Sequence, residues 1–174
     1  MSESRRLFVR NVYWVHEFVP VRPTLSLRLG ARSDGEEWNL PLYPSPLFTV
    51  YKFLVGELDV DVNPELKLSD TERFGPFFTP KLAEQLFDTV EMHPECLDIL
   101  LNCHGGWNRS PAVASAFADV YGWEFFGWPE GERGYNHYIY RLMLEEAARR
   151  KLYTGKIPQP NLTGYPLDSL FIVD

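Results

Sequence analysis

Two kinds of hydrophobic periodicity divide this chain into predicted strands and predicted helices. Over residues 24–29, leucines alternate with polar residues, and this period of two predicts a half-buried strand. Residues 7–15 are rich in β-branched and aromatic side chains and also favour a strand. The short apolar run at 97–101 is typical of a buried parallel strand. The apolar stretch 48–55 leaves its type open, and 59–68 is a weak strand candidate.

Three later segments carry helical spacing. Thr79 followed by a proline predicts an N-cap and a first helical position, and Pro94 ends the helix that begins there. Apolar residues then recur at helical spacing over 110–121, where Gly122 provides a stop. A third helix is predicted over 135–152, with basic residues at its carboxyl end, where cations suit the helix dipole.

The remaining segments are predicted to be irregular. Clusters of Gly, Pro, Asp and Ser indicate long connections over 30–47 and 123–134. The Pro-rich segment 153–174 predicts an extended tail packed on the domain, with room for a short final strand at 170–173. Residues 1–60 contain nothing diagnostic of a function.

The order of these elements predicts the fold class. Helix, strand, loop and helix follow one another in the second half, which indicates an α/β fold with a central, mostly parallel sheet flanked by helices. A length of 174 residues fits a single domain over 1–174. Hydrophobic residues make up 45% and charged residues 24% of the chain, which excludes a disordered or fibrous protein.

Charge and cysteine content narrow the expected partners. The net charge of −7 repels polyanions, so neither nucleic acid nor an anionic membrane is an expected partner. The apolar runs are far shorter than the ~18 residues of a membrane span, and no signal peptide is evident. The two cysteines, Cys96 and Cys103, form neither a disulfide framework nor a zinc site. We therefore expect reduced thiols, a cytoplasmic location and no metal or other cofactor.

One segment carries recognisable chemistry. The predicted strand delivers Cys103 to its carboxyl end, where ligands bind in open α/β sheets, and the next helix begins only six residues later at Arg109. So short a loop has to curl, and two glycines permit the dihedral angles that let backbone N–H groups face an anion. Arg109 offers a planar group for two phosphate oxygens, and the positive field would favour the thiolate of Cys103. Ser110 could donate a hydrogen bond to that thiolate.

The sequence Cys-His-Gly-Gly-Trp-Asn-Arg-Ser resembles the phosphate-binding loop of the cysteine-dependent protein tyrosine and dual-specificity phosphatases. The following Pro-Ala-Val-Ala is similar to small bacterial and phage members, and the resemblance is strong over 97–121 but weaker over 66–96. It implies a protein tyrosine phosphatase-like fold and hydrolysis of phosphomonoesters through a phosphocysteine intermediate. The expected loop residues are His104, Gly105, Gly106, Trp107, Asn108 and Arg109. Phosphate, sulfate or vanadate would bind there, and the substrate would be a phosphorylated protein or a small phosphomonoester.

The resemblance also implies a general acid on a separate loop. In dual-specificity phosphatases this aspartate lies some thirty residues before the cysteine, and Asp70 lies 33 positions before Cys103. Its role would be to protonate the leaving oxygen and then to activate water. Glu72 is the second candidate for the same role.

Departures from the family pattern keep other functions open. Asn102 stands where the family usually has His, and Trp107 and Asn108 replace smaller residues. Asn102 and Trp107 suit a catalytically silent, phosphate-binding pseudophosphatase. An arsenate reductase would need a further thiol, for which only Cys96 is available, and a rhodanese-like sulfurtransferase has a similar loop. Low-molecular-weight tyrosine phosphatases are disfavoured because their loop lies near the N-terminus, whereas Cys103 is in mid-chain.

Overall fold

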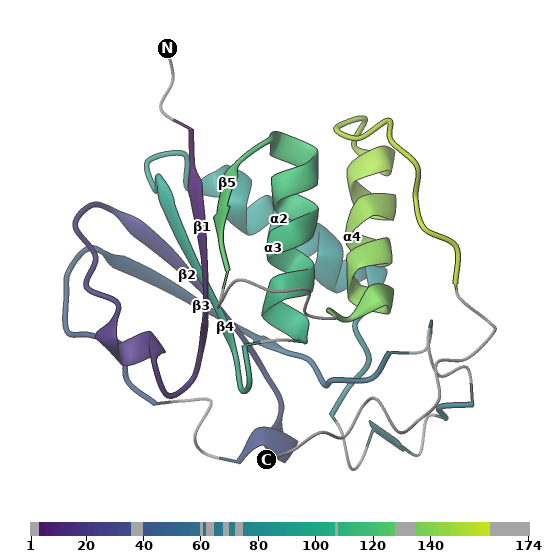
Figure 1. Ribbon diagram of the computed structural model, residues 1–174, viewed down its shortest axis with the longest axis horizontal. Helices are drawn as coiled ribbons and strands as arrows, with labels where there is room; N and C mark the ends of the chain where they lie inside the picture. The colour runs from purple at the N-terminus through teal and green to yellow at the C-terminus, as the bar shows by residue number, and fades with distance from the viewer. Residues whose placement is uncertain are drawn as a thin grey trace.

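Among the described residues, five strands form one parallel sheet in the order β3-β2-β4-β1-β5 (Figure 1). The computed structural model describes residues 4–35, 40–59, 61, 65–67, 70–71, 75–106, 108–127 and 135–160. The strands are β1 (Arg6–Asn11), β2 (Thr24–Gly30), β3 (Phe48–Leu54), β4 (Asp98–Cys103) and β5 (Glu124–Phe126). Because β4 is the middle strand, its carboxyl end lies at the centre of one edge of the sheet.

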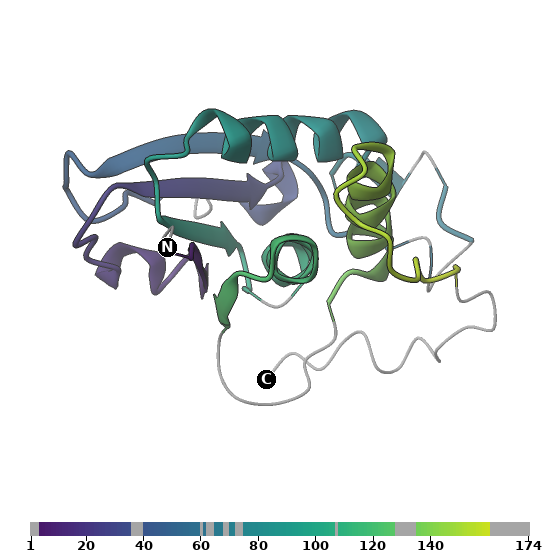
Figure 2. The ribbon, with the colours of Figure 1, turned by 90° about the horizontal axis from the view of Figure 1, so that it is seen from above.

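The helices lie on one face of this sheet. They are α2 (Pro80–Met92), α3 (Arg109–Tyr121) and α4 (His137–Arg149), and the described residues also include two short 3-10 helices, η1 (Val15–Glu17) and η2 (Arg32–Asp34). The connections β3 to β4 and β4 to β5 advance in the same direction across the sheet, so right-handed crossovers put α2 and α3 on the same side. The connections β1 to β2 and β2 to β3 run in the opposite direction. Figure 2 shows η1 on the far side of the sheet from α3 and α4.

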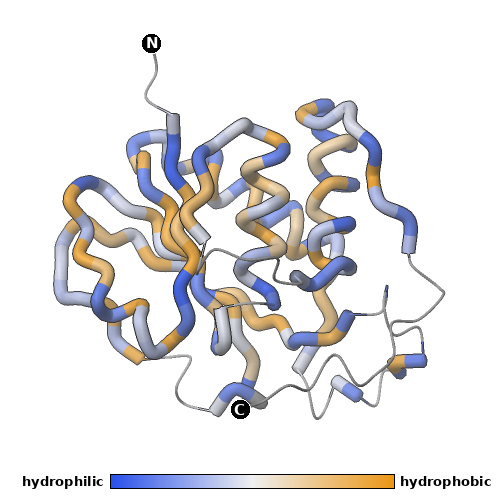
Figure 3. Tube along the Cα trace, in the orientation of Figure 1, coloured by the Kyte–Doolittle hydropathy of each residue, from blue (hydrophilic) through white to orange (hydrophobic). Residues whose placement is uncertain are grey.

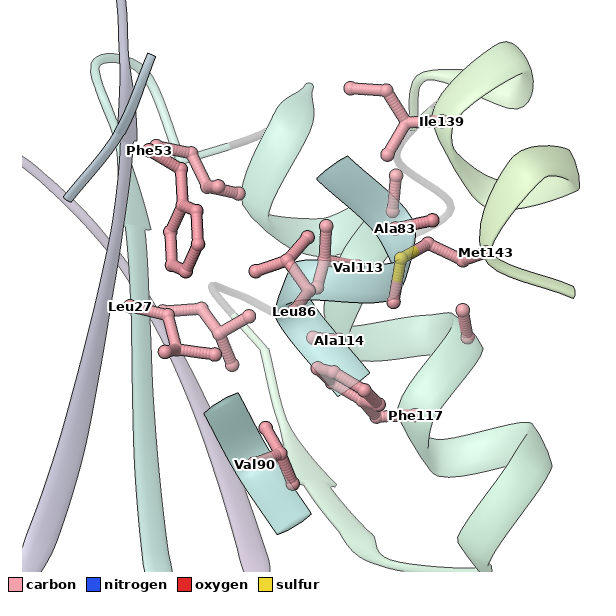
Figure 4. Packing of buried hydrophobic residues seen from close by; sticks show 14 of the residues in the cluster. Leu27, Phe53, Ala83, Leu86, Val90, Val113, Ala114, Phe117, Ile139 and Met143 are labelled. Atoms are coloured by element: carbon pink, nitrogen blue, oxygen red, sulfur yellow. The ribbon is translucent and has the colours of Figure 1, made fainter. Parts of the chain in front are cut away.

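The main core lies between the sheet and the three helices. Side chains alternate along each strand, so Leu27 of β2 faces Leu86 of α2, Phe117 of α3 and Met143 of α4 in one buried cluster (Figure 4). Hydrophobic residues are concentrated where the strands cross the centre of the molecule (Figure 3). This packing fixes α3, and therefore the loop before it, against the central strand.

The second face of the sheet carries more polar groups. Phe8 of β1 packs on Phe18, with ring centroids 5.1 Å apart, and stacks on Phe126 at the same distance. Asp98 of β4 accepts two hydrogen bonds from Arg6 and pairs with Arg22 at 2.7 Å. The connection between β1 and β2, which carries Arg22, is thereby tied to the central strand.

The structure confirms the predicted α/β class, with a wholly parallel sheet flanked by three helices, and this is consistent with the phosphatase-like fold that the resemblance implied. The strands predicted at 24–29 and 97–101 and all three helices are present, and the undecided stretch 48–55 is a strand. Among the described residues, no helix has the length and apolar character needed to cross a membrane.

Four local expectations need correction or fall outside the described residues. The strand predicted over 7–15 ends at Asn11, whose Oδ1 accepts hydrogen bonds from the N–H groups of the two aromatic residues at 13 and 14 and so turns the chain. The strand β2 is buried along its whole length rather than half-buried, because the second face is covered as well. The connection over 123–134 contains the short strand β5. The final strand expected at 170–173 lies outside the described residues.

The weak strand candidate at 59–68 is also wrong for the residues that the structure describes there. Asp59 and Asp61 are buried and bind the third helix instead: Asp59 accepts the N–H groups of His137 and Tyr138, and Asp61 pairs with Arg141. Bonds from a carboxylate to the amino end of a helix outweigh the modest strand preference of the sequence.

We expect Asp98→Asn to destabilise the protein by about 2 kcal/mol at neutral pH, since it removes a buried acceptor of charged hydrogen bonds. Burial opposes ionisation of Asp98, but the hydrogen bonds from Arg6 and Arg22 prevail and lower its pKa. A lowered pKa stabilises the fold above the unfolded value near 4, and this contribution is lost as the pH falls through the folded value. Urea unfolding at several pH values should show a flatter acid dependence in the variant than in the parent.

The control is Asp88→Asn, because Asp88 pairs with Arg150 but lies at the surface. Its loss should be below about 0.5 kcal/mol. Equal losses for the two variants, or an unchanged acid dependence in Asp98→Asn, would show that the buried pairs do not stabilise the sheet.

Candidate active site

Cys103 is the last residue of the central strand, and its thiol is fully buried on the helix-covered face. The hydroxyl of Ser110, in the first turn of α3, donates a hydrogen bond to Cys103 Sγ at 3.1 Å. Both groups are buried, so this contact is shielded from water. The serine that the sequence suggested as a partner of the thiol is therefore in position.

The loop between Cys103 and α3 packs closely against β1. Gly106 has a φ of +74°, and a Cβ there would lie 2.9 Å from the backbone nitrogen of Asn11. The N–H of Val12 also donates to the carbonyl of His104 at 3.1 Å. Gly106 is thus required both for its left-handed backbone and for the close approach to β1.

In this loop, backbone carbonyls accept hydrogen bonds from the protein, whereas several backbone N–H groups donate none to described residues. Its carbonyls bond to the rest of the fold, as the N–H of Asn136 donates to the carbonyl of Asn108 at 3.1 Å. No hydrogen bond between described residues uses the N–H of Gly105, Gly106 or Asn108 as donor. Asn108 is the N-cap of α3 but does not cap it with its side chain. Loop amides and an uncapped helix end provide donors for an anion.

Arg109 is fully buried, and two carboxylates compensate its charge. Asp34 of η2 accepts from Nη1 at 2.7 Å and from Nη2 at 2.9 Å. Nη1 also donates to the carbonyl of Val55 at 3.0 Å, and Nη2 donates to Glu57 Oε1 at 2.9 Å. Burial alone would lower the pKa of Arg109, but the hydrogen bonds to Asp34 and the nearby charges of Cys103 and Glu57 raise it overall.

The fifth N–H of the Arg109 guanidinium differs from the other four. Its Nε is buried and has no acceptor among the residues that the structure describes. A buried donor of a charged group is costly to leave unpaired. An oxygen of a bound oxyanion would satisfy it, so the residues present fit a phosphate group.

The loop, the segment after β3 and the amino end of α4 (Figure 1) are joined by hydrogen bonds of one residue, Asn136. Asn136 caps α4 by accepting the N–H of Ile139, and its Nδ2 lies within 3.2 Å of Asn108 Oδ1 and of the carbonyls of Glu57 and Leu58. Asn136 thus joins three parts of the chain that are far apart in sequence.

Sequence reasoning missed Asp34, Glu57 and Asn136. None belongs to a motif, and Asp34 lay in a segment expected only to be an irregular loop. The one available signal was indirect: an arginine after a buried strand needs acidic partners, but nothing in the pattern says which of the 24 acidic residues supply them.

The two acid candidates are not brought together with the thiol by any described contact. Asp70 Oδ2 accepts the N–H of Lys67 at 2.6 Å and so caps its own turn. Glu72 lies outside the described residues, as does Trp107 of the loop. The assignment of the general acid stays a prediction.

Asn102, which stands where the family has His, lies on the opposite face of β4 from Cys103, since successive side chains alternate. It lies in register between Arg10 on β1 and Arg28 on β2, and its Oδ1 is buried without a hydrogen bond among the described residues. Asn102 therefore lies behind the loop rather than inside the anion site.

The second cysteine, Cys96, lies at the opposite end of β4 from Cys103. Cys96 precedes the amino end of β4, and from Asp98 to Cys103 the strand spans roughly 17 Å at about 3.3 Å per residue. Burial raises the pKa of the Cys96 thiol, and the carboxylate of Glu95 raises it further. A disulfide with Cys103 would need Cα atoms within about 7 Å, so Cys96 is a core thiol and not a resolving cysteine.

A cluster that could hold a metal ion also lies at that amino end. Ligand atoms of His93, Glu95 and Cys96 fall within 4.8 Å of one another. Both ring nitrogens of His93 have protein partners, with Nδ1 3.0 Å from Glu95 Oε1 and Nε2 2.8 Å from the hydroxyl of Tyr51. Hydrogen bonding therefore accounts for this arrangement without an ion.

Comparisons of the chain with models of known protein families, with curated proteins and with solved structures find no match. The likeness to cysteine-dependent phosphatases therefore depends on the residues of this chain and on the geometry described above.

We expect Gly106→Ala to destabilise the protein by about 3 kcal/mol, because the methyl group adds a clash with β1 to the strain of a positive φ. Gly122→Ala is the matched control. It has a φ of +68° but nothing within 4 Å of the added Cβ, so only strain of about 1 kcal/mol should appear. Denaturant unfolding measures both. Similar losses in the two variants would mean that the loop does not depend on its close approach to β1.

Proposed function

We propose that this protein is a cysteine-dependent phosphatase of the protein tyrosine or dual-specificity type. The observation that carries the proposal is the arrangement around the β4–α3 loop. A buried thiol with a serine hydroxyl at 3.1 Å lies at the end of the central strand, and a buried arginine with an unpaired Nε begins the next helix. The nucleophile, the donors for an anion and the hydroxyl that stabilises the departing thiolate then all lie within residues 103–110.

The reaction would proceed in two displacements at phosphorus. Cys103 thiolate attacks, the Sγ–P bond forms, and the bond from phosphorus to the leaving oxygen breaks as Asp70 gives that oxygen a proton. Water then attacks phosphorus while Asp70 takes a proton from it, and the Sγ–P bond breaks to release phosphate. The hydroxyl of Ser110 stabilises the departing thiolate, and Arg109 with the loop amides holds the oxygens throughout.

The substrate class is a phosphomonoester, on a protein or on a small molecule. The net charge of −7 disfavours long polyanions as substrates. Two free cysteines suit a reducing compartment, so we propose the cytoplasm as the location.

A catalytically silent phosphate-binding protein is the second candidate. One observation favours it: four of the five guanidinium N–H groups of Arg109 already have protein acceptors, and three of these acceptors are carboxylate oxygens of Asp34 and Glu57. An arsenate reductase that uses Cys96 is disfavoured, because the strand separates that thiol from Cys103. A rhodanese-like activity has no observation of its own here, and thiosulfate as donor would test it.

Replacing Cys103 tests the enzymatic proposal. We expect the parent to hydrolyse p-nitrophenyl phosphate in the presence of a chelator, and Cys103→Ser to lose more than about 10⁴-fold in kcat, because a hydroxyl is a far weaker nucleophile. The control is Cys96→Ser, which changes the other buried thiol and should keep activity once its folding is verified. A folded parent that binds phosphate but shows no turnover would favour the silent binding protein.

The role of Asp70 is tested by changing the leaving group. In Asp70→Asn we expect kcat for phenyl phosphate to fall by about 10²-fold or more, and kcat for p-nitrophenyl phosphate to fall less, since p-nitrophenolate needs less protonation. Asp119→Asn, an exposed carboxylate on α3, is the control. If Glu72→Gln shows the leaving-group dependence and Asp70→Asn does not, Glu72 is the acid.

A further inference from the structure

The guanidinium of Arg109 has two edges that can each bind two oxygen atoms in parallel. Asp34 fills the edge formed by Nη1 and Nη2. The other hydrogen of Nη1 goes to the carbonyl of Val55. What remains is the second edge, which consists of Nε and the outer hydrogen of Nη2.

Glu57 occupies one half of this second edge. Its Oε1 accepts from Nη2 at 2.9 Å, whereas Nε beside it is buried and has no described acceptor. One carboxylate oxygen therefore stands in a place built for two oxygens. A tetrahedral oxyanion offers a pair of oxygens that matches both donors.

The two carboxylates on Arg109 also differ in how firmly they are held. The side chain of Asp34 is 6% exposed and also accepts the N–H of Ala31 at 2.7 Å, so it is part of the packed structure. The side chain of Glu57 is 44% exposed, and its carboxylate has Arg109 as its one hydrogen-bonded partner among the described residues. Because water can solvate the released carboxylate, Glu57 can leave Arg109 at small cost, as in other half-exposed ion pairs.

Arg141 provides an internal comparison. It has an aspartate and a glutamate as partners too, but there Asp61 takes both Nε and Nη2, and Glu145 accepts from Nη1. The edge that contains Nε is completely filled at Arg141. An arginine that pairs with an aspartate and a glutamate therefore does not always leave Nε unpaired, and the half-filled edge is a property of the site at Arg109.

We infer that Glu57 holds the place of one phosphate oxygen, and that a phosphate group binds by displacing it and accepting from Nε and Nη2 together. Asp34 stays bound and keeps the guanidinium in position. The inference rests on the proposed function for the identity of the oxyanion, and it adds a residue that sets how tightly the site binds phosphate. Since the Glu57 carboxylate competes with the ligand and repels it, removing its charge strengthens binding.

The test is the affinity for inorganic phosphate, measured by isothermal titration calorimetry on the parent and on Glu57→Gln. The glutamine keeps the size of the side chain and removes its charge, and we expect Kd to fall about tenfold. Glu57→Ala, which removes the competing acceptor as well, should bind at least as tightly as Glu57→Gln. With p-nitrophenyl phosphate, KM should fall in parallel if the protein turns it over.

The matched control is Glu145→Gln. Glu145 is also 44% exposed and also pairs with an arginine that an aspartate binds through two oxygens, so the variant makes the same charge change away from the loop. Its Kd for phosphate should stay within about twofold of the parent. Unfolding midpoints of all variants show whether each one is folded.

Weaker or unchanged phosphate binding in both Glu57 variants would overturn the inference and make Glu57 a support of Arg109. If Cys103-dependent turnover persists in that case, the proposed phosphatase stands without it. Tighter phosphate binding by Glu57→Gln in a protein that has no turnover would support the inference and reject the enzyme. Absence of phosphate binding in the parent and in both variants overturns the inference as well.

Discussion

The buried guanidinium of Arg109 is the constraint on which the site depends. A fully buried positive charge has to be neutralised and hydrogen-bonded, and Asp34, Glu57 and the carbonyl of Val55 do this from two separate connections. These contacts fix η2 and the segment after β3 against the amino end of α3. The same constraint leaves Nε unpaired in the interior. The buried guanidinium of Arg109 therefore both holds these segments together and provides a donor for an anion.

The topology of the sheet makes this convergence possible. Because all five strands are parallel, the segments that follow β1, β2, β3 and β4 all begin at one edge of the sheet. β4 is the central strand, so Cys103 and its loop are flanked on both sides: Gly106 packs on Asn11 after β1, and Asp34 approaches after β2. Asn136 then connects the loop to the segment after β3. A thiol at the end of an outer strand would lack this surrounding set of contacts.

Particular residues show how far sequence reasoning reaches. The alternation of Leu25, Leu27 and Leu29 and the Thr-Pro start at residue 79 gave the correct elements, because periodicity and capping are local properties. Local strand preference failed at Asp59 and Asp61, where contacts with helix residues 78 and 80 positions away prevail. The alternation along β2 also did not predict that Ser26 and Arg28 are buried, because it does not reveal that the second face of the sheet is covered.

The sequence by itself determined the α/β class, the placement of Cys103, Arg109 and Ser110 around one short loop, and the need for glycine there, because strand, loop and helix are contiguous in the chain. Only the tertiary structure decided which acids neutralise Arg109 and that Asn102 lies in register between Arg10 of β1 and Arg28 of β2. These features depend on strand order and on connections that bring distant segments to one edge of the sheet. No local pattern encodes that proximity.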